Sequence, residues 1–268
     1  MNRKNLVLFR EFEKFEAFCG ICGHKGFLYF DMPDLRLRRE HGIALFRETL
    51  QCVSCGSTLR QRTLAHVFMK VLRDHYGLSG PTLREMIGVN EILSFWDTDA
   101  FSPISSIISS GRNSVLSKYV PSQPFGVELS PKTFNIDLQN ISFSSDRYDV
   151  ILSSDVMEHV RDDNSAHKEI FRCLKPGGSY VFTVPYNEDK ARTVHLVQTS
   201  SARDLFLDRP HFHGDPISGG ILAYRIYGRE LINQLESIGF VVHFHWIDLP
   251  AEGIIDGDCF VAIKPARQ

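Results

Sequence analysis

Residues 147–160 read RYDVILSSDVMEHV, and residues 174–185 read LKPGGSYVFTVP. Each stretch contains a short apolar run, over 148–153 and 179–184, and a helical segment over 164–174 lies between these runs. Lys175-Pro-Gly-Gly178 ends the helix, because proline stops it and the glycines permit the reversal into the next strand. This order predicts two parallel strands joined by a crossover helix.

The same alternation continues on both sides of this unit. Strand candidates precede it at 91–96, 114–119 and 133–138, and a helix over 228–238 with strands over 240–246 and 259–263 follows it. Strands that alternate with helices predict the α/β class with a doubly wound, mostly parallel sheet. A helix followed by two closing strands predicts an antiparallel edge pair.

Four of the six cysteines form two matched units, Cys19-Gly-Ile-Cys22-Gly and Cys52-Val-Ser-Cys55-Gly. A two-residue spacer lets both sulfurs of a pair face one ion, and the following glycine relieves the tight turn. The alternative is a redox or disulfide pair, but such a pair does not normally occur twice with glycine at the same offset. We therefore expect a structural zinc site, and four thiolate ligands leave no coordination position open for catalysis.

The zinc ligands predict a small N-terminal lobe. The segment between the two knuckles, which includes the basic run 35–39, is expected to form a hairpin or loop. A helix over 58–75, with apolar residues at spacings of three and four, is expected to bridge this lobe to the rest. The predicted division is a zinc-ribbon lobe with its bridging helix at 1–77, and the α/β domain at 78–268.

Composition limits the classes of partner. The chain has 268 residues, 43% hydrophobic and 23% charged, with a net charge of −2. Its excess of basic residues before residue 76 is mild and interleaved with acids, which argues against nucleic-acid binding. No apolar stretch approaches the roughly 18 to 20 residues that cross a bilayer. We expect a soluble, unsecreted, cytoplasmic chain without a membrane partner, and the sequence indicates no oligomeric state.

Three motifs in register carry a family resemblance. The runs 137–143, 147–160 and 174–185 together resemble the Rossmann-like, class I methyltransferases that use S-adenosylmethionine. A narrower likeness adds the double knuckle, Ser57-Thr-Leu-Arg-Gln-Arg62 and the segments 211–216 and 225–228. It looks like a bacterial methyltransferase subgroup with an N-terminal zinc ribbon, whose members are often associated with glycan or secondary-metabolite pathways.

The resemblance implies where the methyl donor binds. Asp137 and Leu138 match the position that holds the adenine amino group and ring, although a surface turn is the alternative for Asp137. Ser153, Ser154 and Asp155 end the next strand, where the donor sulfonium and the acceptor are expected to meet. Asp155 either orients donor or acceptor or caps a helix that begins at Val156.

Two histidines are candidate general bases. His159, about one turn into the expected helix, could take a proton from the acceptor, or could be a packed helix residue that supports the loop. His213 lies in the segment 185–227, the expected acceptor side, and either binds substrate, acts as a base or structures the loop. A second metal site at His211, His213 and Asp215 is a weaker alternative, since no further ligand is fixed.

The first strand departs from the family pattern. It leads into Trp96-Asp-Thr-Asp-Ala-Phe101, which contains no glycine where the family has a glycine-rich turn. Asp97 and Asp99 could instead reach the donor ammonium group, with Trp96 as an apolar wall. The acid expected after the second strand is absent at 118–119, and Glu128 is a substitute for binding the ribose.

Two functions follow. The first is an enzyme that transfers a methyl group from S-adenosylmethionine to an oxygen or nitrogen of a small-molecule or glycan-like acceptor. The alternative is a non-catalytic methyltransferase-fold binding module that has lost the donor site and uses its zinc lobe for partner contact. The absent glycines favour the second function, and the Asp137 and Asp155 regions favour the first.

Overall fold

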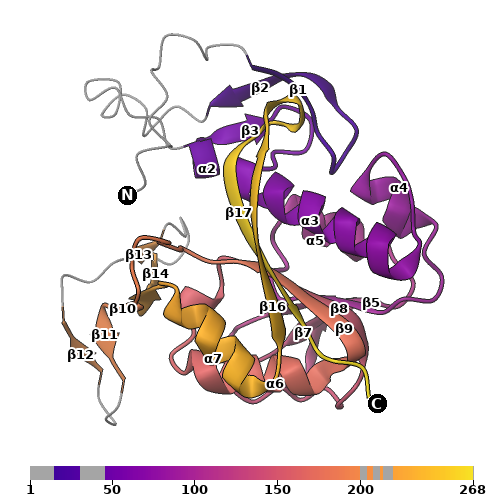
Figure 1. Cartoon of the computed structure of the whole chain (residues 1–268). Coiled ribbons are helices and arrows are strands. Elements are labelled where there is room, and N and C mark those ends of the chain that lie inside the picture. Colours follow the sequence, from indigo (N-terminus) through magenta and orange to yellow (C-terminus); the bar gives the residue numbers. More distant parts are fainter. Residues whose placement is uncertain (1–14, 31–45, 200–203, 208–211, 214–219, 268) are drawn as a thin grey trace.

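The predicted strand, helix and strand are present in a computed structural model that describes residues 15–30, 46–199, 204–207, 212–213 and 220–267. They are β8 (Tyr148–Ser154), α6 (Asp163–Cys173) and β9 (Leu174–Thr183). β8 and β9 pair in parallel, as the crossover predicts. Figure 1 shows α6 packed beneath these two strands.

Around this unit an eight-stranded sheet is formed by the described residues, in the order β16-β17-β9-β8-β4-β5-β7-β6. The added strands are β4 (Phe95–Asp97), β5 (Ser114–Lys118), β6 (Glu128–Ser130), β7 (Thr133–Asn135), β16 (Val241–Leu249) and β17 (Ile254–Ile263). The chain runs outward from β4 to β5 and β7, then returns to β8 on the other side. The strand order therefore reverses between β4 and β8, which is where ligands bind in such sheets.

Both edges of the sheet are antiparallel. β17 runs antiparallel to β9 and β16, which confirms the predicted closing pair. At the other edge β6 turns back on β7, with Glu128 opposite Phe134. This hairpin explains how Glu128 lies only nine residues before Asp137, because no helix intervenes between the two strands.

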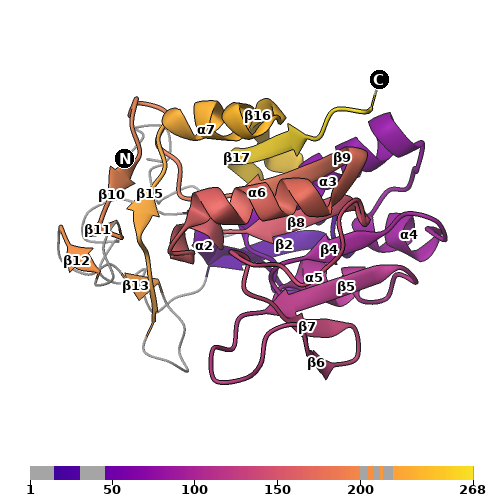
Figure 2. The same cartoon turned by 90° about the horizontal axis from the view of Figure 1, so that it is seen from below.

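Alternating side chains on the strands divide the core into two layers. Phe95, Val150, Leu152 and Val181 face α3 (Leu59–Tyr76), α4 (Leu83–Gly88) and α5 (Pro103–Ile108). Their neighbours Trp96, Ile151, Tyr180 and Phe182 face α6 and α7 (Glu230–Ile238). Figure 1 shows the sheet between these two helical layers, and Figure 2 shows the molecule from the side of α6 and α7. The period of two along each strand thus assigns each residue to its layer.

Several element boundaries differ from the expectation: β7 ends at Asn135 and not at 138, β16 continues to Leu249, and β17 begins at Ile254 and not at 259. Two further differences have a local cause. β4 is shorter than the predicted strand at 91–96, because the Asn90 side chain bonds both the amide and the carbonyl of Leu93 and holds a turn there. β9 starts at Leu174 itself, and its register with β8 shifts between Tyr148 and Val150. Lys175-Pro-Gly-Gly178 is therefore an irregular part of the strand and not a separate loop.

The bridging helix is confirmed as α3. Thr58 caps it in a capping box with Gln61, and Gly77 ends it in the left-handed conformation at φ 68°. Its buried face joins residues of the zinc lobe and of the sheet in one hydrophobic cluster. The lobe is therefore packed onto the α/β unit through a continuous core.

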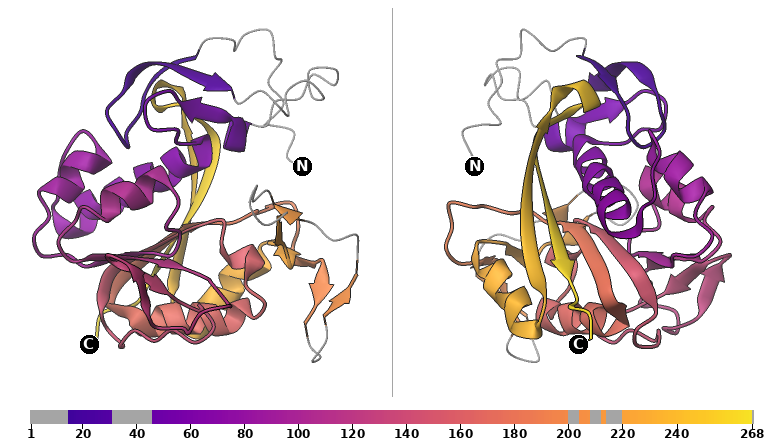
Figure 3. Two further views of the ribbon diagram at one scale, coloured as in Figure 1. Left: turned by 180° about the vertical axis from the view of Figure 1, so that it is seen from behind. Right: turned by 45° about the vertical axis from the view of Figure 1, so that its right-hand side comes forward.

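The N-terminal lobe is a small antiparallel sheet. It contains β1 (Phe15–Phe18), β2 (Lys25–Phe30) and β3 (Leu50–Cys52), and the short helix α2 (Phe46–Thr49) leads directly into β3. The basic run 35–39 lies outside the described residues. Figures 1 and 3 show the β16–β17 hairpin extending from the sheet up to this lobe. The turn η4 (Pro250–Glu252) of this hairpin bonds His66 of α3 through Glu252, at 2.9 Å.

The segment between β9 and α7 forms short antiparallel pairs. They are β10 (Val194–His195) with β15 (Arg225–Ile226), β11 (Val197–Gln198) with β12 (Leu205–Phe206), and β13 (Phe212–His213) with β14 (Ile221–Leu222). Among the described helices, none combines the length and the apolar character that a bilayer crossing requires.

Candidate metal centre and active site

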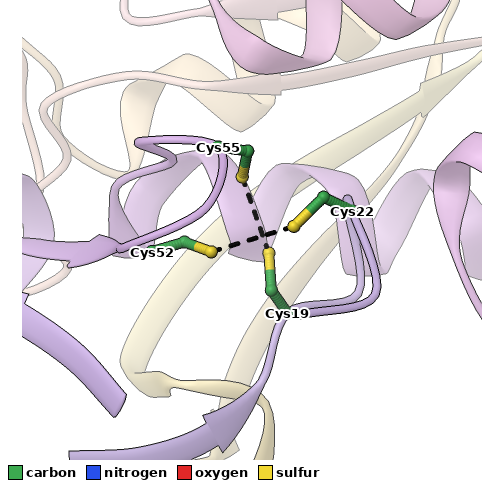
Figure 4. A group of neighbouring side chains, drawn as sticks. All are labelled: Cys19, Cys22, Cys52 and Cys55. Carbon is green, nitrogen blue, oxygen red and sulfur yellow. Dashed lines mark hydrogen bonds between the residues drawn. The ribbon is translucent and has the colours of Figure 1, made fainter. Parts of the chain in front are cut away.

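The four predicted zinc ligands converge. The sulfurs of Cys19, Cys22, Cys52 and Cys55 all lie within 4.8 Å of one another, and Figure 4 shows them pointing to a common centre. The Cys19–Cys55 and Cys22–Cys52 sulfur pairs are each 3.8 Å apart. Zn–S bonds of about 2.3 Å in a tetrahedron place sulfurs about 3.8 Å from each other, so this cluster fits the ion.

Each knuckle is built in the same way. Gly23 and Gly56 have φ of 83° and 72°, and their amides donate to the carbonyls of Cys19 and Cys52 at 2.8 Å. The left-handed backbone explains the glycine after each pair. Buried Arg62 then bonds the carbonyls of Ser57, Leu50 and Gly253. It ties the second knuckle to β3 and to the β16–β17 hairpin.

At the switch point, the turn after β4 is held by its own side chains. Asp97 accepts from the Asp99 amide at 3.1 Å and from the Ser105 hydroxyl at 3.0 Å, and Asp99 accepts from the Phe101 amide at 2.9 Å. The residues of this turn are all described, and none of them has a positive φ. The turn therefore does without glycine because carboxylates fix it in an ordinary backbone conformation.

Burial acts on both acids of this turn. Burial, and then the nearby charge of Asp99, raises the pKa of Asp97 well above its ordinary value. Burial also raises the pKa of Asp99, although the Phe101 amide and the Arg60 charge oppose it. A cation placed beside these two carboxyls would favour their charged forms.

Trp96 is placed differently from the expectation of a cofactor wall. It is fully buried, its ring packs edge-on against Phe143 at 5.2 Å, and its indole N–H donates to Ser117 Oγ. Neighbouring side chains on β4 point to opposite faces of the sheet, so Trp96 points to the face that α6 and α7 cover. The exposed aromatic after β4 is Phe101, at 79% exposure, with Lys118 Nζ 4.0 Å from its ring centre.

β8 ends in the three polar residues that the sequence singled out. Ser153 is fully buried and Ser154 nearly so, while Asp155 has a φ of 50° and its amide donates to Thr183 O at 3.0 Å. A left-handed backbone at a residue other than glycine marks a held position. The expected helix at Val156 is only the short 3-10 turn η3 (Met157–His159), and it has no side-chain cap. The capping alternative for Asp155 is therefore wrong.

The Asp155 carboxylate is clamped by two arginines of the zinc lobe. Arg47 of α2 contacts both oxygens, at 2.5 and 3.1 Å, and Arg60 of α3 lies 3.3 Å away through Nε. Burial alone raises the pKa of Asp155, but the charges of Arg47 and Arg60 outweigh it and hold that pKa well below its ordinary value. Sequence analysis assigned no role to either arginine.

Arg60 also joins the two turns of the switch point. Its Nη1 donates to Ser154 Oγ at 2.5 Å, and its charge acts on Asp99 of the β4 turn. Both carboxylate oxygens of half-exposed Glu48 accept hydrogen bonds from Arg60, at 2.7 and 3.0 Å. The Arg60 guanidinium thus contacts Ser154 and Asp155 and acts through its charge on Asp99, and Asp97 joins this group through its bond with the Asp99 amide.

His159 is tied to the segment expected to face the acceptor. Its Nδ1 lies 2.8 Å from Leu222 O, and Nε2 lies 3.7 Å from Glu158 Oε1. Since a carbonyl only accepts, Nδ1 is the donor of this hydrogen bond, and Nε2 is turned toward Glu158. His213 is in β13, and its side chain, like His211 and Asp215, lies outside the described residues.

Arg225 fixes the backbone that carries His159. It is buried and donates to the carbonyls of Met157, Val160 and Arg161 at 2.6 to 3.0 Å. The sequence marked the segment 225–228 as part of a likeness but gave Arg225 no role.

Asp137 and Leu138 follow β7. The Asp137 carboxylate accepts from the amide and the side chain of Gln139, at 2.9 and 3.0 Å, and Leu138 is buried. Asp137 thus holds a turn at the carboxyl edge of the sheet. Beyond β5, Tyr119 is 61% exposed and stacks on Phe125 with ring centres 5.5 Å apart.

Comparison with known proteins places this geometry in a family. Residues 108–243, just over half of the chain, match a family model described as a methyltransferase domain. The match runs from the end of α5 into β16, and it includes the Asp137 turn and the Asp155 corner. No match was found among curated proteins.

Three solved structures are similar to the chain at low identity. A SAM-dependent methyltransferase from Methanosarcina mazei is 16% identical, covering 67% of this chain and 95% of that one, with a TM-score of 0.43. An S-adenosylmethionine-dependent methyltransferase from Mesorhizobium loti is 16% identical, with 64% and 89% coverage and a TM-score of 0.41. The 1,6-didemethyltoxoflavin-N1-methyltransferase of Burkholderia thailandensis is 13% identical, with 75% and 78% coverage and a TM-score of 0.44.

Proposed function

Since the chain belongs to the methyltransferase-domain family, a class of enzymes that use S-adenosylmethionine, we propose that it methylates an oxygen or nitrogen of a small-molecule or glycan-like acceptor. The single observation that carries this proposal is the gathering of Asp97, Asp99, Ser154 and Asp155 at the reversal of strand order. These polar groups lie where the donor and the acceptor meet in a sheet of this topology.

The residues of the β4 turn suit the amino-acid end of the donor. Asp97 is buried and Asp99 half-buried, and the pKa values of both are raised, so an ammonium group beside them would favour their charged forms. Trp96 takes no part in this site, and Phe101 replaces it as the available aromatic. Bound S-adenosylmethionine supplies an electrophilic methyl carbon, and the chain's task is to orient it.

The adenosine end is assigned to the turns after β5 and β7. Asp137 offers a carboxylate to the adenine amino group, and Leu138 offers apolar contact. Exposed Tyr119 and Phe125 give stacking surface beside them. Glu128 is part of the adjoining edge hairpin, where its carboxylate accepts from the Lys132 amide at 2.8 Å. We therefore assign Glu128 to holding this turn before assigning it to ribose binding.

Asp155, whose pKa two arginines hold well below its ordinary value, is a weak base and is assigned the orientation of donor or acceptor. Proton transfer is assigned to His159, whose Nδ1 is bonded to Leu222 O and whose backbone Arg225 holds. It is the candidate to take the proton that an acceptor hydroxyl or amine releases during transfer. His213 stays a prediction for the same role on the acceptor segment.

A non-catalytic module is the less favoured function. The missing glycines suggested it, yet the β4 turn keeps an ordinary backbone by means of Asp97, Asp99 and Ser105. A glycine-free turn is therefore compatible with a formed donor site.

Titration with S-adenosylhomocysteine tests the proposed function. We expect calorimetry to detect binding to the full chain and the melting temperature to rise with ligand concentration. Asp137→Ala should weaken this binding by about 1 to 3 kcal/mol through the lost charged hydrogen bond. Glu91→Ala is the matched control, because Glu91 is exposed near the opposite end of β4. Absence of binding to the wild-type chain at millimolar ligand would contradict the enzyme.

A further inference from the structure

The zinc lobe and the Asp155 corner are connected by short covalent paths. Arg47 lies five residues before Cys52, and Arg60 lies five residues after Cys55. Both arginines therefore flank the second knuckle, one on α2 and one in the first turn of α3. Arg62 fixes the same stretch to Gly253 of the β16–β17 hairpin. The metal lobe thus delivers two guanidiniums to a distant strand end.

The contacts at that strand end are specific. Arg47 meets both oxygens of Asp155 and also Val184 O at 3.3 Å, which fixes the plane of its guanidinium. The side chains of Arg47, Arg60 and Asp155 are 28%, 14% and 15% exposed. A bidentate contact in a largely buried position gives directional control that an exposed ion pair lacks.

The charges around Asp155 need these arginines. Asp258 of β17 faces the same corner, and its Oδ1 lies 3.6 Å from Arg47 Nη2. Burial raises the pKa of Asp258, and the Asp155 charge adds to the rise although Arg47 opposes it. The charged groups that face Asp155 are therefore Arg47, Arg60 and Asp258, with Glu48 attached through Arg60. Two half-buried acids side by side repel each other when both are ionised, and cations between them reduce this repulsion.

We propose that Arg47 and Arg60 are positioning residues of the methyl-transfer site, and that the zinc lobe is the mount that holds them against Asp155. The inference rests on the proposed function, because that function places Asp155 where donor and acceptor meet. The zinc ion then contributes to the site by holding the lobe that carries these arginines, and it needs no vacant coordination position to do so. The lobe is then a wall of the active site and not a separate docking module.

The test follows the carboxyl ¹³C resonance of Asp155, assigned with Asp155→Asn, through a pH titration of the full zinc-loaded chain. In the Arg47→Gln/Arg60→Gln double variant we expect the proton affinity of Asp155 to rise at least tenfold, because burial then acts unopposed. Arg60→Gln alone should raise the proton affinity of Asp155 by a smaller factor. Arg60→Lys should leave this proton affinity close to that of the wild type. Lys70→Gln is the matched control, since Lys70 lies on α3 in an exposed pair with Asp74.

The outcomes separate the inference from the proposed function. In the Lys70→Gln control, a zinc content of one ion per chain and an unchanged affinity for S-adenosylhomocysteine establish that the fold is intact. An Asp155 proton affinity within twofold of wild type in both Arg60→Gln and the double variant would overturn the inference. If the double variant does not fold, the Asp155 titrations of Arg60→Gln and Arg60→Lys test the inference instead. Failure of the wild-type chain to bind S-adenosylhomocysteine would instead remove the proposed function, whatever the arginines do.

Discussion

The two turns at the switch point are held in opposite ways. The turn after β4 is fixed by hydrogen bonds among Asp97, Asp99 and Ser105, which are at most eight residues apart. The corner after β8 is fixed by Arg47 and Arg60, which are about a hundred residues away in sequence from Asp155. One turn is built locally, and the other depends on a second lobe.

The difference extends to charge. The β4 turn holds buried Asp97 and half-buried Asp99, and burial raises the pKa of both acids. The Asp155 corner has two guanidiniums, and it favours the carboxylate. The first turn is suited to receive a cation, whereas the second already contains its cations. Neighbouring strand ends can therefore serve different tasks in one site.

Among the changes considered, removal of the zinc should have the largest effect, and it should affect the Asp155 corner but not the β4 turn. In Cys52→Ser the ion loses one of four ligands, and the free energy of unfolding should fall by more than about 4 kcal/mol because metal binding is coupled to folding. Arg47 and Arg60 lose their mount, while the β4 turn keeps its own hydrogen bonds. Elemental analysis should find the metal reduced from one ion per chain, and urea denaturation measures the stability.

The control for this change is Cys173→Ser. Cys173 is fully buried but lies in the α6 layer, far from the metal cluster in sequence and core. This variant should keep one zinc ion per chain while losing some packing energy. Retention of the metal by Cys52→Ser would mean that the four-thiolate site is wrong.

Replacing the clamped acid gives the next largest effect. Asp155→Asn leaves Arg47 and Arg60 partly buried without their carboxylate, and we expect a loss of about 2 kcal/mol at pH 7, less than for a fully buried pair because these side chains retain some exposure. The folded-state pKa of Asp155 is lowered, so its contribution is complete above the unfolded value near pH 4 and is lost as the pH falls further. The difference in unfolding free energy between the two proteins should therefore begin to narrow as the pH falls from about 4 to 3.

Sequence analysis succeeded where the determining contacts are local. The knuckles follow from Cys-x-x-Cys-Gly spacing, and the cap and end of α3 follow from Thr58 and Gly77. The strand ends at Asp97 and Ser154 follow from the apolar runs before them. Arg47 carries no such signal, because its role depends on how α2 lies against β8, which is a tertiary contact. The same reason hides Asp258.

The error at Trp96 has a different cause. The sequence located β4, but the side-chain face changes at every position along a strand. Phe95 and Trp96 are both large and apolar, so their pattern does not distinguish the two layers. The antiparallel strand β6 was missed because Glu128–Ser130 contains only one apolar residue. Where local pattern is ambiguous, packing against the helices decides.

The smallest expected effect has the opposite sign, and it sharpens the comparison. Burial raises the folded-state pKa of Asp97, so its folded form binds a proton more tightly than the unfolded chain, and stability falls as the pH rises through that range. Asp97→Asn removes the ionisation and should stabilise the free chain at pH 7 by about 0.5 to 2 kcal/mol.

The hydrogen bonds of the turn survive this change. The asparagine oxygen can still accept from the Asp99 amide, and its amino group can donate to Ser105 Oγ, which itself donates to Asp99 O. S-adenosylhomocysteine should nevertheless bind more weakly to Asp97→Asn, because the ammonium group loses its carboxylate. Greater stability together with weaker binding is the combination that a cation-receiving turn requires. A variant that is less stable at pH 7, or one that binds the ligand as well as wild type, would show that Asp97 is a structural acid and that the β4 turn does not receive a cation.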